Sequence, residues 1–241
     1  MKQGEAYFVI VDISGYTGFV QMHRTSMVHA EQIITDLMES VLDQKRSPLI
    51  LDKLQGDAAI FYTWDDGSPE LASSIAQQVL NFFKAFQTTE KVLVSCKVCI
   101  CDACNQIDGL RLKGILHHGE LVLKEMGGST ELAGADVILA HRLEKNHIEG
   151  NEYIVMSKAF HDRCGDLQGL EPHRSSENYG PLGDIEIVNF YPNPSTAPIP
   201  TPTIWKKLSF FGKIEWYGIQ RMLFGKKPPG DFRNLPDESS A

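Results

Sequence analysis

The hydrophobic positions of this chain alternate between strand-like and helix-like patterns. Residues 6–14 (AYFVIVDIS) open with a continuous apolar run, which is typical of a strand buried on both faces. Residues 28–44 place their apolar side chains on one stripe at helical spacing. Two β-rich runs, 49–55 and 58–63, flank the turn pair Gly56–Asp57, so this stretch predicts a hairpin.

The same alternation continues to residue 191. A second amphipathic helix begins near Leu71. Strands are then predicted at 110–126, 152–156 and 184–191, and helices at 134–146 and 157–164. Strands that interleave singly and in pairs with helices predict an α+β sandwich, with a mainly antiparallel sheet and helices packed on one side.

Composition changes after the last predicted strand. The globular domain is predicted to span residues 1–191, and residues 192–204, which contain five prolines, predict an extended linker. In the tail of residues 205–241, the segment 205–227 carries six Lys and Arg residues against one Glu, mixed with aromatic residues. This mixture is typical of a helix at an anionic membrane surface. Docking of the aromatic side chains onto the protein's own surface or a dimer mate is the alternative.

Charge and cysteine usage narrow the function classes. The formal net charge of −8 argues against nucleic acid as a partner, because phosphate neutralisation needs an excess of Lys and Arg. The chain shows neither an apolar run of 18 residues nor the basic start and cleavage site of a signal peptide. We therefore expect a cytoplasmic protein in a reducing compartment, peripheral at the membrane only where the tail binds an anionic surface and does not dock on the protein itself.

Two aspartates lie where predicted strands end. Asp12 closes the first buried strand, and Asp57 lies at the hairpin tip. If the hairpin pairs beside the first strand, the two carboxylates converge, as in sites that hold Mg²⁺ on a nucleotide. The alternative is an unrelated Asp at a strand end and another in a turn. The glycines Gly15 and Gly18 follow Asp12 in an amide-rich turn that suits an anion.

Four motifs occur in order: VDISGYTGF, KLQGDAAIFY, ILHHGEL and GADVILAHRLE. Together, over residues 6–191, they resemble the catalytic domain of class III nucleotidyl cyclases. The chain looks most like a bacterial branch with a Cys-rich stretch before the HxG strand. The resemblance implies a ferredoxin-like cyclase sandwich and a head-to-tail homodimer. It also implies conversion of a nucleoside triphosphate, with ATP favoured, into a 3′,5′-cyclic nucleotide and pyrophosphate.

The resemblance also implies the metal site and the catalytic residue. Asp12 and Asp57 match the aspartates that bind two Mg²⁺ or Mn²⁺ ions, with the Ile13 carbonyl as a further ligand. Arg142 matches the arginine that stabilises charge on the α-phosphate, a task that suits a guanidinium fork. In the homodimer this arginine and the metal ligands come from opposite subunits.

The same resemblance implies the substrate contacts. Lys53 and Glu131 match the two positions that recognise the base, and in the family a Lys at the first position accompanies specificity for adenine. Gly15, Tyr16 and Thr17, in the turn after the first strand, are the remaining expected substrate-binding residues.

Two departures from the family pattern favour a different function. Ile138 stands where the family has an asparagine that orients the ribose, and an isoleucine supplies no hydrogen bond. The stretch 178–187 (NYGPLGDIEI) lacks the lysine that contacts the triphosphate in the family. The alternative function is therefore a degenerate cyclase-fold module that binds nucleotide or acts as a scaffold without turnover.

Four of the five cysteines lie within residues 96–104. Three of them, Cys99, Cys101 and Cys104, can join a histidine or Cys164 in a structural zinc site, although zinc ligand pairs are usually farther apart along the chain. Buried or surface thiols are the alternative that the short spacing favours.

The adjacent histidines His117 and His118 lie on a predicted strand. Successive side chains of a strand point to opposite faces, so one of the two is predicted to face inward and the other outward. No Ser-His-Asp or Cys-His arrangement is evident along the sequence, which gives hydrolytic nucleophilic catalysis no support.

Overall fold

The computed structural model describes residues 1–22, 27–96 and 105–194. The chain divides into two units, Met1–Thr201 and Pro202–Ala241, and all described residues belong to the first. The three predicted zinc ligands Cys99, Cys101 and Cys104 lie outside the described residues, as do most of the predicted linker and the whole tail.

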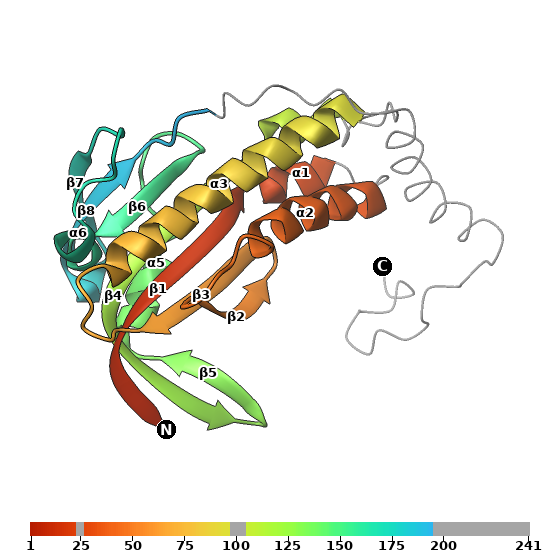
Figure 1. Ribbon diagram of the computed structural model, residues 1–241. Coiled ribbons are helices and arrows are strands. Elements are labelled where there is room, and N and C mark those ends of the chain that lie inside the picture. Colours follow the sequence, from red (N-terminus) through yellow and green to blue (C-terminus); the bar gives the residue numbers. More distant parts are fainter. Residues whose placement is uncertain (23–26, 97–104, 195–241) are drawn as a thin grey trace, which may run out of the picture. The chain divides into compact units, whose positions relative to one another are not determined.

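One mainly antiparallel sheet organises the described residues (Figure 1). Its strands are β1 (Lys2–Ser14), β2 (Ile50–Gln55), β3 (Ala58–Trp64), β4 (Arg111–Met126), β5 (Ser129–Ala133), β6 (Tyr153–Ser157), β7 (His173–Asn178) and β8 (Asp184–Phe190). The order is β2-β3-β1-β4-β6-β8-β7, and β5 pairs with β4 off this path. Only the β4–β6 pair is parallel among the described pairings.

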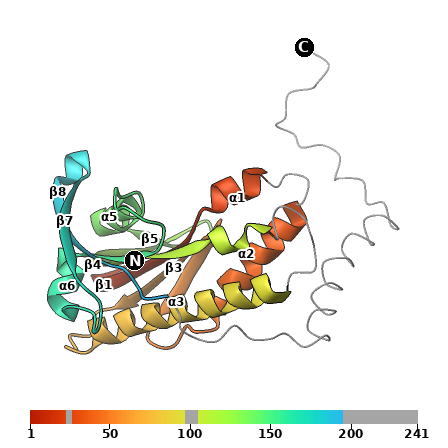
Figure 2. The same cartoon turned by 90° about the horizontal axis from the view of Figure 1, so that it is seen from above.

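Helices cover this sheet. They are α1 (Tyr16–Met22), α2 (Met27–Leu42), α3 (Leu71–Cys96), α5 (Ala135–Leu143) and α6 (Lys158–Cys164), with short 3₁₀ turns η2 (Ile107–Gly109) and η3 (Gly180–Leu182). The long helices α2 and α3 lie side by side on one face, whereas short α5 lies on the other (Figure 2). The predicted α+β fold with a mainly antiparallel sheet is confirmed, and the long helices pack on one side of it as predicted, while the short α5 adds cover on the other side.

The first strand β1 is buried because helices cover both faces of the sheet. Ala6, Phe8 and Ile10 of β1 pack in one cluster with Leu139 and Leu143 of α5. The alternate side chains of β1 point to the opposite face, because a strand alternates its side chains. On that face the helix α3 approaches so closely that a side chain at position 114 of β4 would meet two α3 residues at 3.2 Å.

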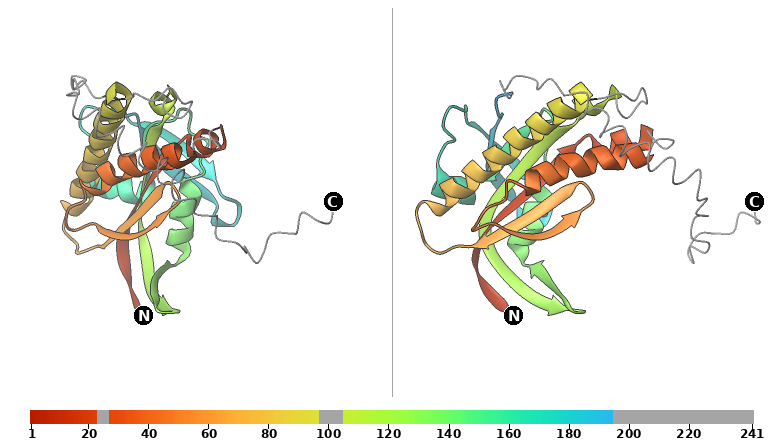
Figure 3. Two further views of the ribbon diagram at one scale, coloured as in Figure 1. Left: turned by 90° about the vertical axis from the view of Figure 1, so that its right-hand side faces the viewer. Right: turned by 45° about the vertical axis from the view of Figure 1, so that its right-hand side comes forward.

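Most of the predicted elements are present. The predicted hairpin is formed by β2 and β3, and the amphipathic patterns form α2 and α3. The hairpin of β4 and β5 extends beyond the helices beside the start of β1, where Lys2 pairs with Leu123 (Figure 3). The sequence patterns missed α1 and β7, since a helix of seven residues and a polar edge strand carry no clear apolar period. Within the described residues, no helix has the length and apolar character needed to cross a bilayer.

Candidate functional site

Asp12 and Asp57 come together where β1 ends. The hairpin of β2 and β3 pairs beside β1, as the convergence of the two aspartates requires, and Asp12 lies opposite Ala58. The Ile13 N–H donates to the Asp57 carbonyl at 3.3 Å, which fixes the hairpin tip against the strand. Asp12 is buried, and burial, followed by the charge of Asp12, raises the pKa of Asp57 to about 7. A raised pKa of this kind is the effect of two like charges held close together.

Lys113 of β4 is a cation of the site that sequence reasoning missed. It lies opposite Asp12 in the β1–β4 register, and its Nζ is 3.0 Å from Asp12 Oδ2. Burial opposes the charge of Lys113, but the facing carboxylates, Asp12 foremost, raise its pKa overall. The only signal in the sequence was a lysine inside an apolar strand, and its partner depended on the register.

The turn after β1 lies close to this carboxylate pair. Gly15 has a φ of 92°, which favours glycine, and its carbonyl accepts from Phe19 N at 2.9 Å in the first turn of α1. Tyr16 donates its hydroxyl to Glu31 of α2 at 3.2 Å. Burial, Glu31 and then the charge of Asp57 raise the pKa of Tyr16. Gly15 and Thr17 are exposed.

Lys53 and Glu131 meet although 78 positions separate them. Lys53 Nζ, on β2, is 2.7 Å from Glu131 Oε2, on β5. The hydrogen bond to Glu131 raises the pKa of Lys53, and the same bond lowers the pKa of Glu131. The two positions named as partners in reading a base therefore form one donor–acceptor pair within a single chain.

Helix α5 presents Arg142 and Ile138 to the outside. Leu139, Ala140 and Leu143 face the core, whereas the Ile138 side chain is 55% exposed and Arg142 is exposed. Within the described part of the chain, the Arg142 guanidinium forms no hydrogen bond or ion pair, and in particular none with the two aspartates.

His117 and His118 correct the expectation that one of the two faces outward. Both are 3% exposed, because α5 covers one face of β4 and α6 covers the other. His118 Nε2 lies 2.8 Å from Asp65 Oδ2. His117 bridges Ser157 Oγ, at 2.7 Å from Nδ1, and Asp136 Oδ1, at 3.2 Å from Nε2.

A Ser-His-Asp arrangement is thus present, against the sequence-based expectation that there is none. Ser157 is 2% exposed, and its Oγ accepts from Phe160 N as the N-cap of α6. Burial lowers the pKa of His117, which keeps the ring neutral between its two partners. Asp136 Oδ2 also accepts from the Glu120 N–H at 2.7 Å. The arrangement ties α5 and α6 to β4 and leaves the Ser157 hydroxyl inaccessible to a substrate.

The described residues contain no group of three or more His, Cys, Asp or Glu side chains arranged to hold a metal ion. A structural zinc site therefore has no support in this part of the chain. Cys164 is a free thiol, and burial raises its pKa. A metal at Asp12 and Asp57 would need its remaining ligands from backbone, water or substrate oxygens.

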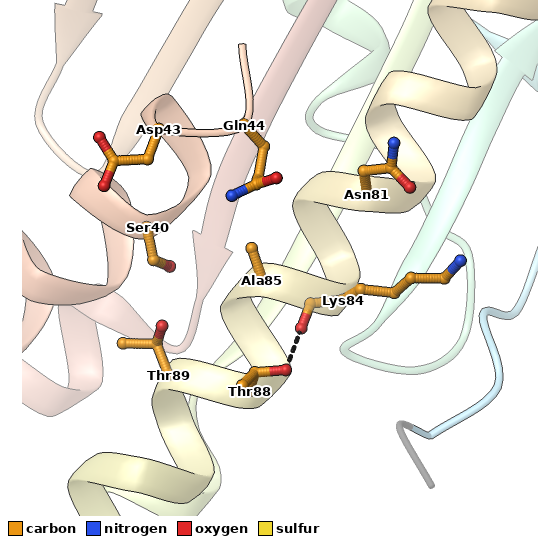
Figure 4. A pocket seen from close by; sticks show the side chains of 8 residues that line it. All are labelled: Ser40, Asp43, Gln44, Asn81, Lys84, Ala85, Thr88 and Thr89. Carbon is orange, nitrogen blue, oxygen red and sulfur yellow. Dashed lines mark hydrogen bonds between the residues drawn. The ribbon is translucent and has the colours of Figure 1, made fainter. Parts of the chain in front are cut away.

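A groove of about 470 Å³ lies between α2 and α3, away from these residues (Figure 4). Its lining mixes hydroxyl and amide side chains with Asp43 and Lys84. The Lys84 side chain points away from Asp43, and Thr88 donates its hydroxyl to the Lys84 carbonyl at 2.7 Å. The groove contains none of the predicted site residues, and its polar groups do not converge on a common point.

The fold is that of class III nucleotidyl cyclase domains. The crystal structure of the adenylyl cyclase CyaB from P. aeruginosa matches with a TM-score of 0.60 and 13% identity, covering 83% of this chain and 98% of that one. The crystal structure of the guanylyl cyclase Cya2 matches with a TM-score of 0.59 and 14% identity, covering 83% of this chain and 98% of that one. The guanylate cyclase domain of RhGC from Catenaria anguillulae, in complex with GTP, matches with a TM-score of 0.54 and 14% identity. The match covers 80% of this chain and 100% of that one.

Sequence comparison places the chain among closer relatives. A family described as "Protein of unknown function (DUF2652)" matches residues 34–153. The "Uncharacterized protein Rv2561/Rv2562" of Mycobacterium tuberculosis (strain ATCC 25618 / H37Rv) is 30% identical over 208 residues, which cover 84% of this chain and 94% of that protein. The chain belongs to the same family as this mycobacterial protein.

Proposed function

We propose that the protein is a nucleotidyl cyclase that converts a nucleoside triphosphate, with ATP favoured, into a 3′,5′-cyclic nucleotide and pyrophosphate. The observation that carries this proposal is the convergence of Asp12 and Asp57 at the end of β1, inside a cyclase fold. In the reaction, the ribose 3′-oxygen gives its proton to solvent water and bonds to the α-phosphorus. The bond from the α-phosphorus to the bridging oxygen breaks, and pyrophosphate leaves.

The carboxylate pair fits a divalent cation. Mg²⁺ and Mn²⁺ prefer oxygen ligands, and Mg²⁺ sites on nucleotides use one or two carboxylates together with phosphate oxygens. Asp12 and Asp57 supply the carboxylates, and the Ile13 carbonyl is the expected backbone ligand. When bound, two such ions lower the pKa of the ribose hydroxyl and neutralise triphosphate charge.

The residues of the chain supply the other contacts. Lys113, half-buried beside Asp12, adds positive charge where the triphosphate would lie. Lys53 donates and Glu131 accepts side by side, which matches a ring nitrogen next to an amino group, as in adenine. Gly15 and Thr17, which are expected to contact the substrate, are exposed.

A homodimer completes this arrangement. Arg142 is exposed on α5, and in the proposed dimer it reaches the α-phosphate bound by a second copy of the chain. A guanidinium from the partner subunit would stabilise the charge that develops in the transition state. The proposed active unit is therefore a head-to-tail homodimer.

One observation favours the alternative, nucleotide binding without turnover. Ile138 lies one helical turn before Arg142 on the exposed face of α5, and it offers no hydrogen bond to a ribose. Loss of one transition-state hydrogen bond lowers turnover by about 100-fold or more. A protein of this kind binds its nucleotide in the same site and reports its presence to a partner.

Product analysis tests the proposal. Purified full-length protein is incubated with Mn²⁺ and each of the four nucleoside triphosphates, and the products are separated by chromatography. We expect a cyclic nucleotide from ATP that disappears in Asp57→Asn and persists in Asp43→Asn, a control at an exposed position after α2. Binding of ATP without any cyclic product would support the alternative, and a product retained in Asp57→Asn would overturn the assignment of the site.

A further inference from the structure

Asp52 occupies an irregular position in β2, next to Lys53. Leu51 pairs with Phe61 and Lys53 pairs with Ile60, so Asp52 is an extra residue in the ladder. Such a bulge redirects the side chain of the extra residue and bends the strand. The Asp52 side chain is turned inward and is 7% exposed.

One oxygen of this buried carboxyl group lacks a hydrogen bond. Asp52 Oδ2 is inaccessible to solvent and accepts no hydrogen bond from any described residue. Its nearest cationic atom is Lys53 Nζ at 3.6 Å, which is longer than a charged hydrogen bond. Burial raises the pKa of Asp52, and Lys53 opposes that shift. A buried acceptor without a donor is costly, so its presence calls for an explanation.

Lys53 therefore lies between two carboxylates and bonds to one of them. Its Nζ is 2.7 Å from Glu131 and 3.6 Å from Asp52. While Lys53 holds Glu131, neither side chain is free to bind a ligand fully. A base that donates an amino hydrogen to Glu131 competes with the ammonium group for the same carboxylate, and an ammonium group that moves towards the base needs a further partner.

We propose that Asp52 is this second partner: it receives the Lys53 ammonium group when a 6-aminopurine base bonds to Glu131. The inference rests on the proposed function, which assigns Lys53 and Glu131 to the base. The shift that closes the Lys53–Asp52 hydrogen bond is about 1 Å. Asp52 is a positioning residue, because it acts on the base through Lys53.

This exchange makes recognition depend on the amino group. An amino-bearing purine gives Glu131 a new donor, and Lys53 moves to Asp52 while still facing the ring nitrogen. A purine without the amino group offers Glu131 no hydrogen-bond donor. The Lys53–Glu131 ion pair then remains intact, and Asp52 does not contribute to binding. Guanine places a carbonyl oxygen against Glu131, which repels it.

Binding measurements on Asp52→Asn test the exchange without turnover. The ligands are the α,β-methylene analogues of ATP and of purine riboside triphosphate, which differ by the amino group and cannot release pyrophosphate. Affinities are measured by calorimetry with Mn²⁺ on the full chain. Glu39→Gln, at an exposed position of α2, is the control for loss of one negative charge.

We expect Asp52→Asn to lower the binding affinity for the ATP analogue about tenfold, and that for the purine riboside analogue less than threefold. Thermal unfolding of ligand-free Asp52→Asn should occur at or above the wild-type temperature, because the variant removes a buried charge. Equal weakening of both analogues, or no weakening, would overturn the role of Asp52 and leave the cyclase proposal untouched. Failure of the wild type to bind either analogue would overturn both proposals.

Discussion

Replacing Asp57 by asparagine should stabilise the metal-free, nucleotide-free protein at pH 8. In the wild type, burial and the charge of Asp12 raise the pKa of Asp57 from 3.8 to about 7. The full shift corresponds to about 4 kcal/mol against folding above pH 7. Asp57 is partly exposed, so water screens much of this energy, and we expect a gain of about 1–2 kcal/mol.

The sign of the pH dependence follows from the raised pKa. The folded state holds the Asp57 proton more tightly than the unfolded state does, so the free energy of unfolding falls as pH rises from about 4 to 7. Asparagine cannot ionise, and the variant lacks this fall. The gain over the wild type should therefore be largest at pH 8 and shrink towards pH 5.

Thermal unfolding followed by circular dichroism in EDTA measures the effect. A gain of about 1–2 kcal/mol raises the midpoint by roughly 3–6 °C for a chain of this size. Asp43→Asn, at an exposed position, should leave the midpoint unchanged at both pH values. An Asp57→Asn midpoint at or below wild type at pH 8, or an equal gain at pH 5, would refute the electrostatic reasoning.

Three further substitutions probe neighbouring parts of the site. Lys113→Met leaves the buried Asp12 carboxylate without its cation and should lower the free energy of unfolding by about 3 kcal/mol in urea, with part of the loss restored by Mn²⁺. Gly119→Ala adds a Cβ that would overlap the Asp136 carboxyl group, so it should lower the free energy of unfolding in urea by about 1–3 kcal/mol. Ile138→Asn adds the missing hydrogen-bond donor on the face of Arg142 and should raise the rate of cyclic product formation about 100-fold. An unchanged rate in Ile138→Asn would indicate that the ribose does not reach α5.

The site was predictable where it depended on local sequence. Asp12 follows a continuous apolar run, and Asp57 occupies a Gly-Asp turn between two β-rich runs, so both positions and their convergence followed from the pattern once the hairpin paired beside β1. The Lys53–Glu131 contact came only from the family resemblance, because no periodicity relates residues 78 positions apart.

The pairing register of the strands and the helices that cover the sheet decided the remaining contacts of the site. Asp12 meets Lys113 because β1 and β4 pair in one register, and a slip of one residue would place the two side chains on opposite faces. His117 and His118 are both buried because helices cover both faces of β4, a fact that no single strand encodes. The sequence by itself determined most of the segments that form strands, helices and turns, α1 and β7 excepted, since apolar spacing is a local property. Only the tertiary structure decided which polar side chains face each other, since pairing register and helix coverage arise from contacts between distant segments.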